Sequence, residues 1–329
     1  MMRRLVLAVL LGLVAARSDA GELYYSTPGD PNSRNIYAVN ENGGTPRVVL
    51  YGSEYPSGSI AGMTRFNHAG SNGQALVQAK PYSAPAADIQ LVYRASNGQV
   101  ITRPVTDLEG EGLNPYGDPE LAQDDSFFSF RARDGAGRST IWRLNVTVDQ
   151  ALAPDYVPPA SFDDPRLHLV VDDPTNGAEN HGHTWSPEGT RLAYLDTWMD
   201  AGGVGRISIR IKIMAAGSTD PLSHPRILDT LRETSIWAAS LHWSPVSDQI
   251  LNFSRDANGR NCGIWVCYAD SPGVMTWVAK PITTKSKTQT VTEELRLPLW
   301  RPDGQRIACA YTKYTTNKLG TTTRSSSRR

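Results

Sequence analysis

The feature that most limits how this chain can fold is a tryptophan-proline pattern that occurs three times. Residues 183–196 read HTWSPEGTRLAYLD, and related stretches begin at Ser240 (SLHWSPVSDQILNFSRD) and at Leu297 (LPLWRPDGQRIACAYTK). Successive tryptophans are 58 and 57 residues apart, and so are the prolines. The shared positions are Trp185, Pro187 and Gly189 in the first copy, Trp243 and Pro245 in the second, and Trp300, Pro302, Asp303 and Gly304 in the third. A fixed period of this size indicates a repeat architecture.

Each copy predicts a β-hairpin. A short strand ends at the tryptophan, the proline sets φ at the second position of a tight turn, and an acid-glycine pair suits the remaining corners. Alternating apolar residues after the turn predict the returning strand. The second copy has Val246-Ser247-Asp248 in place of the glycine pattern, which predicts a longer turn there.

Two further strands complete each unit. An Ile-aromatic pair marks the third strand, at Ile36-Tyr37, Ile141-Trp142 and Ile264-Trp265, and short runs such as PRVVL and RLHLVV supply a fourth. Recurring four-stranded antiparallel units predict an all-β fold, a β-propeller. We expect six blades, over residues 22–50, 59–106, 113–172, 179–230 and 236–284 and from residue 293 onward. The last blade is expected to be incomplete or shared between the termini, and five blades with a composite one, or a truncated chain, remain alternatives.

The N-terminus has the order of a secretory signal. Two arginines precede an apolar run from Leu5 to Ala16, followed by small residues at Ser18 and Ala20. The run is too short to span a bilayer, so we expect residues 1–20 to be a signal peptide cleaved near Ala20. The protein is then periplasmic or secreted, with a propeller domain over residues 21–314, a disordered basic tail over residues 315–329 and no membrane span after cleavage.

The charge balance limits the partners. The chain has 33 Lys and Arg residues against 33 Asp and Glu residues. Without a net charge, no overall field attracts nucleic acid or an anionic membrane. We expect a monomer that needs no cofactor and does not bind nucleic acid.

Together these motifs resemble a known family. Three copies of W-[SR]-P-x-[GS] before a short β run, with R-D-x-x-G-x-x-I-W downstream, are similar to the WD40-like repeats of TolB-type β-propellers. The resemblance implies a non-catalytic scaffold that binds a protein or a cell-envelope component. No segment of the sequence resembles the α/β domain that precedes the propeller in the family's namesake, so we expect the propeller module alone and do not extend the namesake's own envelope complex to this chain.

A few residues are candidates for ligand binding. His181 and His183 are two positions apart on an expected strand, so they should share one face near the central channel. His242 lies in the equivalent strand of the next unit, and Trp198 adjoins a glycine-rich loop where a carbohydrate could bind. The alternative function is a polysaccharide-active enzyme, similar to oligogalacturonate lyases, with a channel metal site; two histidines in register are too few to assign one. Trp142 and Trp265, like the other repeat tryptophans, are expected to pack between blades.

Overall fold

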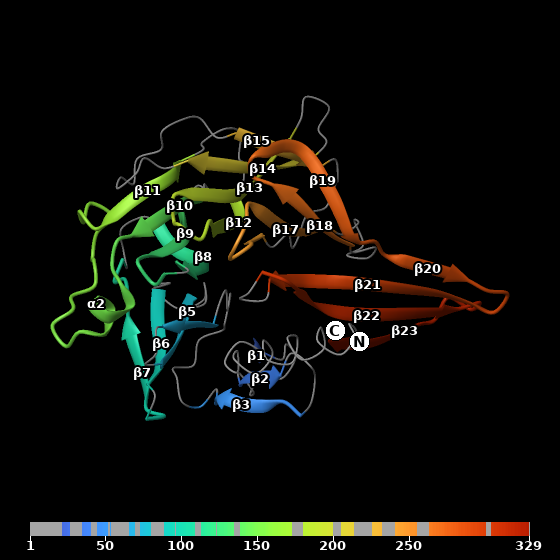
Figure 1. Cartoon of the computed structure of the whole chain (residues 1–329), viewed down its shortest axis with the longest axis horizontal. Helices are drawn as coiled ribbons and strands as arrows, with labels where there is room; N and C mark the ends of the chain where they lie inside the picture. Colours follow the sequence, from blue (N-terminus) through green and yellow to red (C-terminus); the bar gives the residue numbers. More distant parts are fainter. Residues whose placement is uncertain are drawn as a thin grey trace, which may run out of the picture. The chain divides into compact units, whose positions relative to one another are not determined.

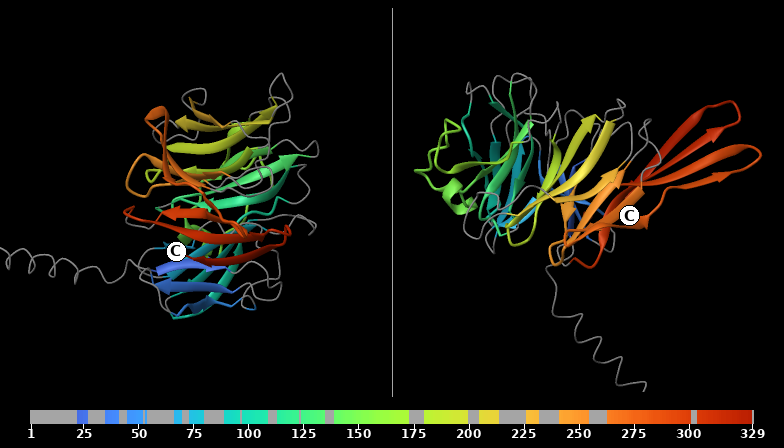
Figure 2. Two further views of the ribbon diagram at one scale, coloured as in Figure 1. Left: turned by 90° about the vertical axis from the view of Figure 1, so that its right-hand side faces the viewer. Right: turned by 90° about the horizontal axis from the view of Figure 1, so that it is seen from above.

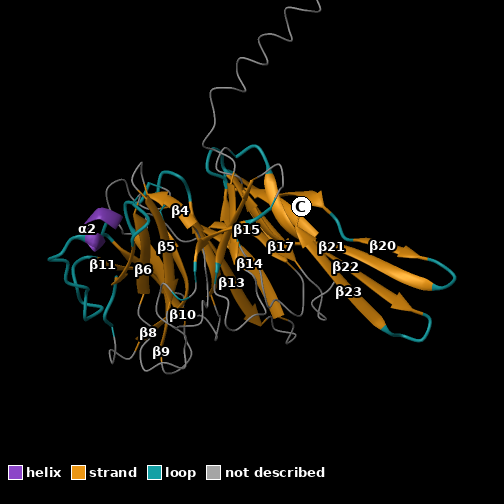
Figure 3. Cartoon of the chain, turned by 90° about the horizontal axis from the view of Figure 1, so that it is seen from below, coloured by secondary structure: helices purple, strands orange, loops and turns teal. Residues whose placement is uncertain are grey.

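Apart from one short helix, the regular elements that the structure describes are strands of antiparallel β-sheets (Figure 1). This computed structural model describes residues 22–26, 35–40, 45–51, 53, 66–69, 73–79, 89–95, 97–108, 113–122, 124–134, 139–172, 180–199, 205–213, 226–231, 241–254, 263–300 and 304–328. Within them the only helix is the short α2 (Val148–Leu152), drawn in purple in Figure 3. No helix in this described part is long and apolar enough to cross a membrane.

Two compact units divide the chain, Met1–Glu54 and Tyr55–Arg329. The first contains a sheet of three strands, β1 (Glu22–Ser26), β2 (Ile36–Asn40) and β3 (Arg47–Leu50), in that order. Every pairing within it is antiparallel.

The second unit contains five sheets of four strands each in its described part. The first two are β4 (Phe66–Ala69), β5 (Gly73–Ala79), β6 (Ile89–Ala95) and β7 (Val100–Pro104), then β8 (Leu113–Leu121), β9 (Phe128–Asp134), β10 (Ser139–Leu144) and β11 (Leu167–Asp172). The next two are β12 (Asn180–Trp185), β13 (Arg191–Met199), β14 (Gly205–Ile213) and β15 (Arg226–Leu231), then β16 (His242–Trp243), β17 (Gln249–Ser254), β18 (Gly263–Tyr268) and β19 (Ser271–Ala279). The last is β20 (Ile282–Lys285), β21 (Gln289–Trp300), β22 (Ile307–Asn317) and β23 (Thr322–Arg328).

These sheets confirm the predicted all-β fold of four-stranded antiparallel units. Each sheet takes its strands in chain order from one continuous stretch, and each sheet of the second unit contacts the next through its neighbouring strands. This is the blade organisation of a β-propeller. Figure 2 shows the successive twisted sheets from two further sides.

The expectations for the last blade and for the C-terminal tail were wrong. The sheet β20–β23 has four strands of its own, and among the described residues it is the first sheet that has three. Ile282–Lys285 pairs with β21, so the fifth unit ends before it. Residues Thr322–Arg328 form β23 along β22, where we expected disorder, because threonine suits a strand and β22 supplies the hydrogen-bonding partner.

Among the described residues the predicted hairpin is found four times, once more than the tryptophan pattern indicated. The first strand pairs with the second across a constant span of seven residues at Trp185↔Leu192, Trp243↔Ile250 and Trp300↔Ile307. Leu121↔Phe128 has the same span between β8 and β9. That copy has Leu in place of Trp and Gln in place of Pro, so a search for the tryptophan does not find it.

The turns explain which residues each copy needs. In the first copy Ser186 N–H donates to Arg191 O at 2.9 Å and Gly189 N–H donates to Ser186 O at 2.9 Å. Gly189 has φ +67°, and a Cβ there would lie 2.9 Å from Cε1 of Phe127 in the preceding sheet. Glycine is therefore required both by the backbone conformation and by the close approach.

The second copy differs from our expectation of a longer turn. Ser244 N–H donates to Gln249 O at 2.7 Å, across the same number of residues as in the first copy. Among the described residues, Asp125 is the only non-glycine residue with positive φ, so Ser247 avoids the left-handed conformation. The loss of glycine therefore changes the backbone of the turn and leaves its length unchanged.

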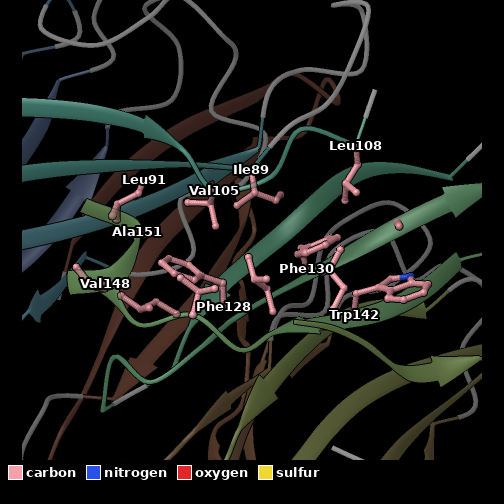
Figure 4. Close-up of a cluster of buried hydrophobic side chains, with 14 residues drawn as sticks. Ile89, Leu91, Val105, Leu108, Phe128, Phe130, Trp142, Val148 and Ala151 are labelled. Atoms are coloured by element: carbon pink, nitrogen blue, oxygen red, sulfur yellow. The ribbon is translucent and has the colours of Figure 1, made fainter. Parts of the chain in front are cut away.

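The hydrophobic cores lie between successive sheets. Figure 4 shows the cluster that joins β6 to the sheet of β8–β11 and to α2, with Ile89, Leu91, Phe128, Phe130, Trp142 and Ala151 among its members. Trp185 packs in a second cluster with Phe127 and Val171 of the preceding sheet. Trp300 packs against a third, which contains Leu251 and Ile264. Because each apolar core needs two adjacent sheets, neighbouring units stabilise one another.

Candidate functional site

Buried polar side chains gather where the first strands of three successive sheets meet. Strand β12 contacts both β8 and β16. On these strands and on β9, the buried polar residues include Glu120, Ser129, His183 and Thr184. Buried polar groups are costly unless they are hydrogen-bonded, so their partners decide what this cluster does.

Thr184 joins all three sheets. Its Oγ1 donates to Glu120 Oε1 on β8 at 3.1 Å and accepts from the backbone N–H of Trp243 on β16 at 3.2 Å. The side chains of Thr184 and Glu120 are both buried. One hydroxyl therefore connects a carboxylate in one sheet to the backbone of the sheet two units further along.

His183 and Trp185 form a second connection between sheets. His183 Nε2 lies 2.8 Å from Ser129 Oγ on β9, and that oxygen accepts from Trp185 Nε1–H at 2.9 Å. The strand β12 is thus bonded through two side chains to one serine of the preceding sheet.

The Ser129–His183 pair has the spacing of a nucleophile and its general base. However, Ser129 is 0% exposed and His183 is 6% exposed. Because the serine oxygen also accepts the tryptophan N–H, a substrate carbonyl has no approach to it in this arrangement. The geometry favours a structural contact between sheets over nucleophilic catalysis.

The two-residue spacing from which His181 and His183 were expected to share a face does not apply here, because the strand is irregular between them. His181 pairs with Leu195 and His183 with Tyr194, so the register shifts between the two histidines. Gly182 lies in this bulge with φ +65°. A bulge adds one residue and breaks the alternation of faces. The side chain of His181 lies outside the described part.

The other predicted ligand residues are placed on separate elements. His242 is half-buried on β16 opposite Leu251, at the position that corresponds to Thr184. Trp198 is on β13 opposite Arg206, and its side chain and the adjoining loop are outside the described residues. Within the described ranges, no three His, Cys, Asp or Glu side chains gather as metal ligands. Of the predicted repeat residues, Pro302 and Asp303 also lie outside the description.

Two arginines that sequence reasoning missed cover repeat tryptophans of the following sheet. Arg143 on β10 places Cζ 3.8 Å from the Phe127 ring centroid and 5.4 Å from that of Trp185, and its Nη1–H donates to Gly189 O at 3.2 Å. Burial lowers the pKa of Arg143 from its ordinary value. Such cation–π contacts add to the cohesion between sheets.

Arg191 repeats this arrangement one sheet further on. Its Cζ lies 5.0 Å from the Trp243 ring centroid, and its Nη1 lies 3.2 Å from Asp270 Oδ1 of that sheet. Arg191 comes directly after the turn of the first copy, and this position in the repeat is the sequence signal by which it could have been identified. A cation there faces the indole of the next unit.

The turn between β8 and β9 contains Asp125, which has a left-handed backbone conformation and a half-buried carboxyl group. Asp125, at φ +59°, takes the place of Gly189, since its N–H donates to Ala122 O at 3.0 Å as that of Gly189 does to Ser186 O. Burial, with the nearby charges of Asp124 and Asp149, raises the pKa of Asp125 to about 6. Its Oδ1 is buried and has no hydrogen-bond partner among the described residues.

A stacked aromatic pair lies on the neighbouring strands β18 and β19. The rings of Trp265 and Trp277 stack with centroids 4.6 Å apart and planes at 19°. Lys280 Nζ lies 5.7 Å from the Trp277 centroid, and Trp277 is 41% exposed. Trp265 therefore packs within its own sheet, which differs from the packing of Trp185 between two sheets.

Comparisons with known proteins extend only to the fold. No family model and no curated protein matches the sequence. A structure of puromycin hydrolase aligns with 94% of this chain and 54% of its own at 14% identity and a TM-score of 0.48. A puromycin-hydrolyzing peptidase of Mycobacterium tuberculosis aligns with 92% of this chain and 45% of its own at 16% identity and a TM-score of 0.48.

A third similar structure has nearly the same length as this chain. Regucalcin of Agrobacterium tumefaciens, described as a calcium-binding protein, aligns with 88% of this chain and 85% of its own at 14% identity and a TM-score of 0.45. By contrast, this chain spans about half the length of the two hydrolases. At such low identity and similarity these matches carry no information on activity or ligands.

Proposed function

We propose that the protein is an exported, non-catalytic β-propeller scaffold, similar to TolB-type propellers, that binds a protein or another cell-envelope component. The observation that carries this proposal is the use of the buried polar side chains. Ser129, His183, Thr184 and Glu120 are engaged between sheets, so the groups best suited to chemistry act in cohesion. Binding is then left to the strand ends and loops around them.

The sequence supplies the remaining support. The secretory signal at residues 1–20 favours the periplasm or the cell exterior, and the W-[SR]-P repeats resemble those of exported scaffolds. Propellers present loops from several blades at one end, which suits recognition of a macromolecular partner or a carbohydrate.

The alternative, a polysaccharide-active enzyme with a channel metal, needs His181 and His183 to converge with further ligands. The bulge at Gly182 and the engagement of His183 with Ser129 argue against that convergence. A zinc-type site needs three or four ligands in one place.

Binding is tested with the chain from residue 21 onward as bait in envelope extract. A captured partner must be identified and its binding reproduced with purified components. Trp198→Ala, beside the glycine-rich loop, should weaken that binding about tenfold, as loss of an aromatic hot spot does. Trp277→Ala, on an outer strand, is the matched control and should bind normally; no reproducible partner, or equal effects of the two variants, contradicts the proposal.

The non-catalytic half of the proposal has its own test. Purified protein is assayed on glycosides, lactones, peptides and acidic polysaccharides, alongside Ser129→Ala. We expect no turnover by either. Turnover that disappears in a folded Ser129→Ala protein would assign the Ser129–His183 pair to catalysis and overturn this half.

A further inference from the structure

The distal half of the last sheet is mostly polar, and its first strand and its turns are exposed. All four residues of β20 are exposed, as are Asn317 at the end of β22 and Thr322 and Thr323 on β23. Threonines pair across the strands, at Thr283–Thr292 and Thr316–Thr322, with Oγ1 atoms 3.5 Å and 2.9 Å apart. The sheet therefore continues beyond its apolar core as a hydrated extension (Figure 3).

This extension is strongly basic, although the whole chain has no net charge. Residues 282–292 and 311–329 contain no Asp or Glu. They carry seven cations, Lys285, Lys287, Lys313, Lys318, Arg324, Arg328 and Arg329. A local excess of this kind creates a field that the balanced total hides.

Two turns lie side by side at the end of the extension. Gln289 pairs with Asn317, so the turn after β20 and the turn after β22 adjoin. Lys285, Lys287 and Lys318 are all exposed there. Beside Lys318, Leu319 is 90% exposed, the highest value among the exposed large apolar side chains of the described residues.

Side chains hold both turns in shape. Ser286 Oγ accepts from the N–H groups of Thr288 and Gln289 at 3.3 and 3.1 Å. Asn317 Oδ1 accepts from those of Leu319 and Thr321 at 3.0 and 2.9 Å. The lysines and the leucine are thus presented on an ordered backbone, which lowers the entropy cost of binding.

We propose that this tip, defined as Lys285, Lys287, Lys318 and Leu319, docks on the surface of an anionic lipid bilayer. The lysines complement the lipid headgroup charge, and Leu319 enters the boundary between headgroups and acyl chains. This contact goes beyond the scaffold role and does not depend on it.

Leu319 distinguishes a bilayer from other polyanions. An acidic polysaccharide attracts the lysines but offers no apolar layer for a leucine. Single-stranded nucleic acid is bound on exposed aromatic platforms, whereas Tyr311 and Tyr314 of the extension are half-buried. An exposed leucine directly after Lys318 therefore favours the bilayer.

The proposal is tested by co-sedimentation of the chain from residue 21 onward with phosphatidylcholine vesicles, with and without phosphatidylglycerol. Binding is expected only to the anionic vesicles and should weaken with salt. The triple variant Lys285→Gln, Lys287→Gln, Lys318→Gln should bind roughly a hundredfold more weakly, since each lysine near such a surface contributes about fivefold. Leu319→Ser should bind about tenfold more weakly because it loses apolar burial.

Two matched controls separate the tip from general effects. Arg47→Gln, Arg103→Gln, Arg306→Gln removes the same charge from exposed positions elsewhere, and Val157→Ser removes an aliphatic group that is 70% exposed. Both should bind vesicles normally, and circular dichroism checks the fold of every variant. The proposal is overturned if the protein binds no vesicles, or if the arginine control loses as much vesicle binding as the lysine variant. Heparin serves as a polyanion without an apolar layer. The proposal is also overturned if the protein binds heparin as well as it binds anionic vesicles and Leu319→Ser leaves vesicle binding intact.

Discussion

Asp125 shows how a single residue can depart from the repeat while its turn is kept. In two of the other three copies the same position is a glycine, Gly189 or Gly304, both with φ +67°. An aspartate tolerates the left-handed conformation better than most residues, but it adds a half-buried carboxyl. The turn at Asp125 therefore loses free energy through backbone strain and carboxyl burial, which the turns at Gly189 and Gly304 do not.

The first prediction concerns the pH dependence that follows from this carboxyl. Burial and the charges of Asp124 and Asp149 raise the pKa of Asp125 from 3.8 to about 6, so the folded state holds the proton more tightly than the unfolded chain does. The free energy of unfolding therefore loses a contribution as the pH rises from about 4 to about 6, and that contribution stays absent above this range.

Asp125→Gly should remove this pH-dependent loss and also relieve the backbone strain. We expect the free energy of unfolding to increase by roughly 1 kcal/mol near neutral pH. Asp125→Asn should remove the pH-dependent part and keep the side chain at the left-handed position. Urea titrations at pH 4 and pH 7 compare both with the parent protein. Equal differences between the two pH values in all three proteins would contradict the prediction.

The second prediction concerns Gly189. Gly189→Ala places a Cβ in the left-handed region and 2.9 Å from Phe127, whereas Gly98→Ala at φ +85° meets no atom within 4 Å. Each substitution should lower the free energy of unfolding by roughly 1 kcal/mol, because alanine is strained in the left-handed region. Only Gly189→Ala adds a steric clash. Thermal unfolding should show Gly189→Ala as the less stable variant by a further 1 kcal/mol or more.

At the level of the elements, the hairpin and its turn follow from local sequence. Proline at the second turn position and an alternating strand are preferences between near neighbours, so the pairing of Trp185 with Leu192 could be predicted. The copy at Leu121 was missed because it has Gln123 and Asp125 at the positions of the proline and the glycine. Its signal in the sequence is the apolar alternation that follows them.

The third prediction tests the connection that Thr184 makes between elements. Thr184→Val keeps the shape but removes the hydroxyl that donates to Glu120 and accepts from Trp243 N–H, so two buried partners lose a hydrogen bond. We expect a loss of about 1–3 kcal/mol in the free energy of unfolding. Thr283→Val, on the exposed strand β20, is the matched control and should change stability by less than about 0.5 kcal/mol. Chemical denaturation decides whether the two differ.

For the whole molecule, the order of sheets follows the order of the repeats. Each core lies between consecutive sheets, so the second unit depends on neighbour contacts along the chain. The basic extension could not be predicted from charge counts, because its seven cations are balanced elsewhere in the sequence. Pairing of β20 to β23 brings the six of them up to Arg328 into one sheet and its two turns.

The fourth prediction concerns export of the whole chain. When the protein is expressed in a bacterial host, mass spectrometry of the periplasmic product should show loss of residues 1–20 and a new N-terminus at Gly21. Arg3→Glu with Arg4→Glu should leave the uncleaved chain in the cytoplasm, because the signal loses its positive region. A processed product from that variant, or an uncleaved periplasmic chain from the parent, contradicts the export proposal.

The sequence by itself determined the recurring hairpin and the four-stranded units, because turn and strand preferences act between residues that are close along the chain. Only the tertiary structure decided that His183 meets Ser129, 54 residues away, and that Gly182 breaks the alternation between two histidines. Such contacts depend on how sheets twist and pack against each other, and a one-residue bulge is enough to change which face a side chain occupies.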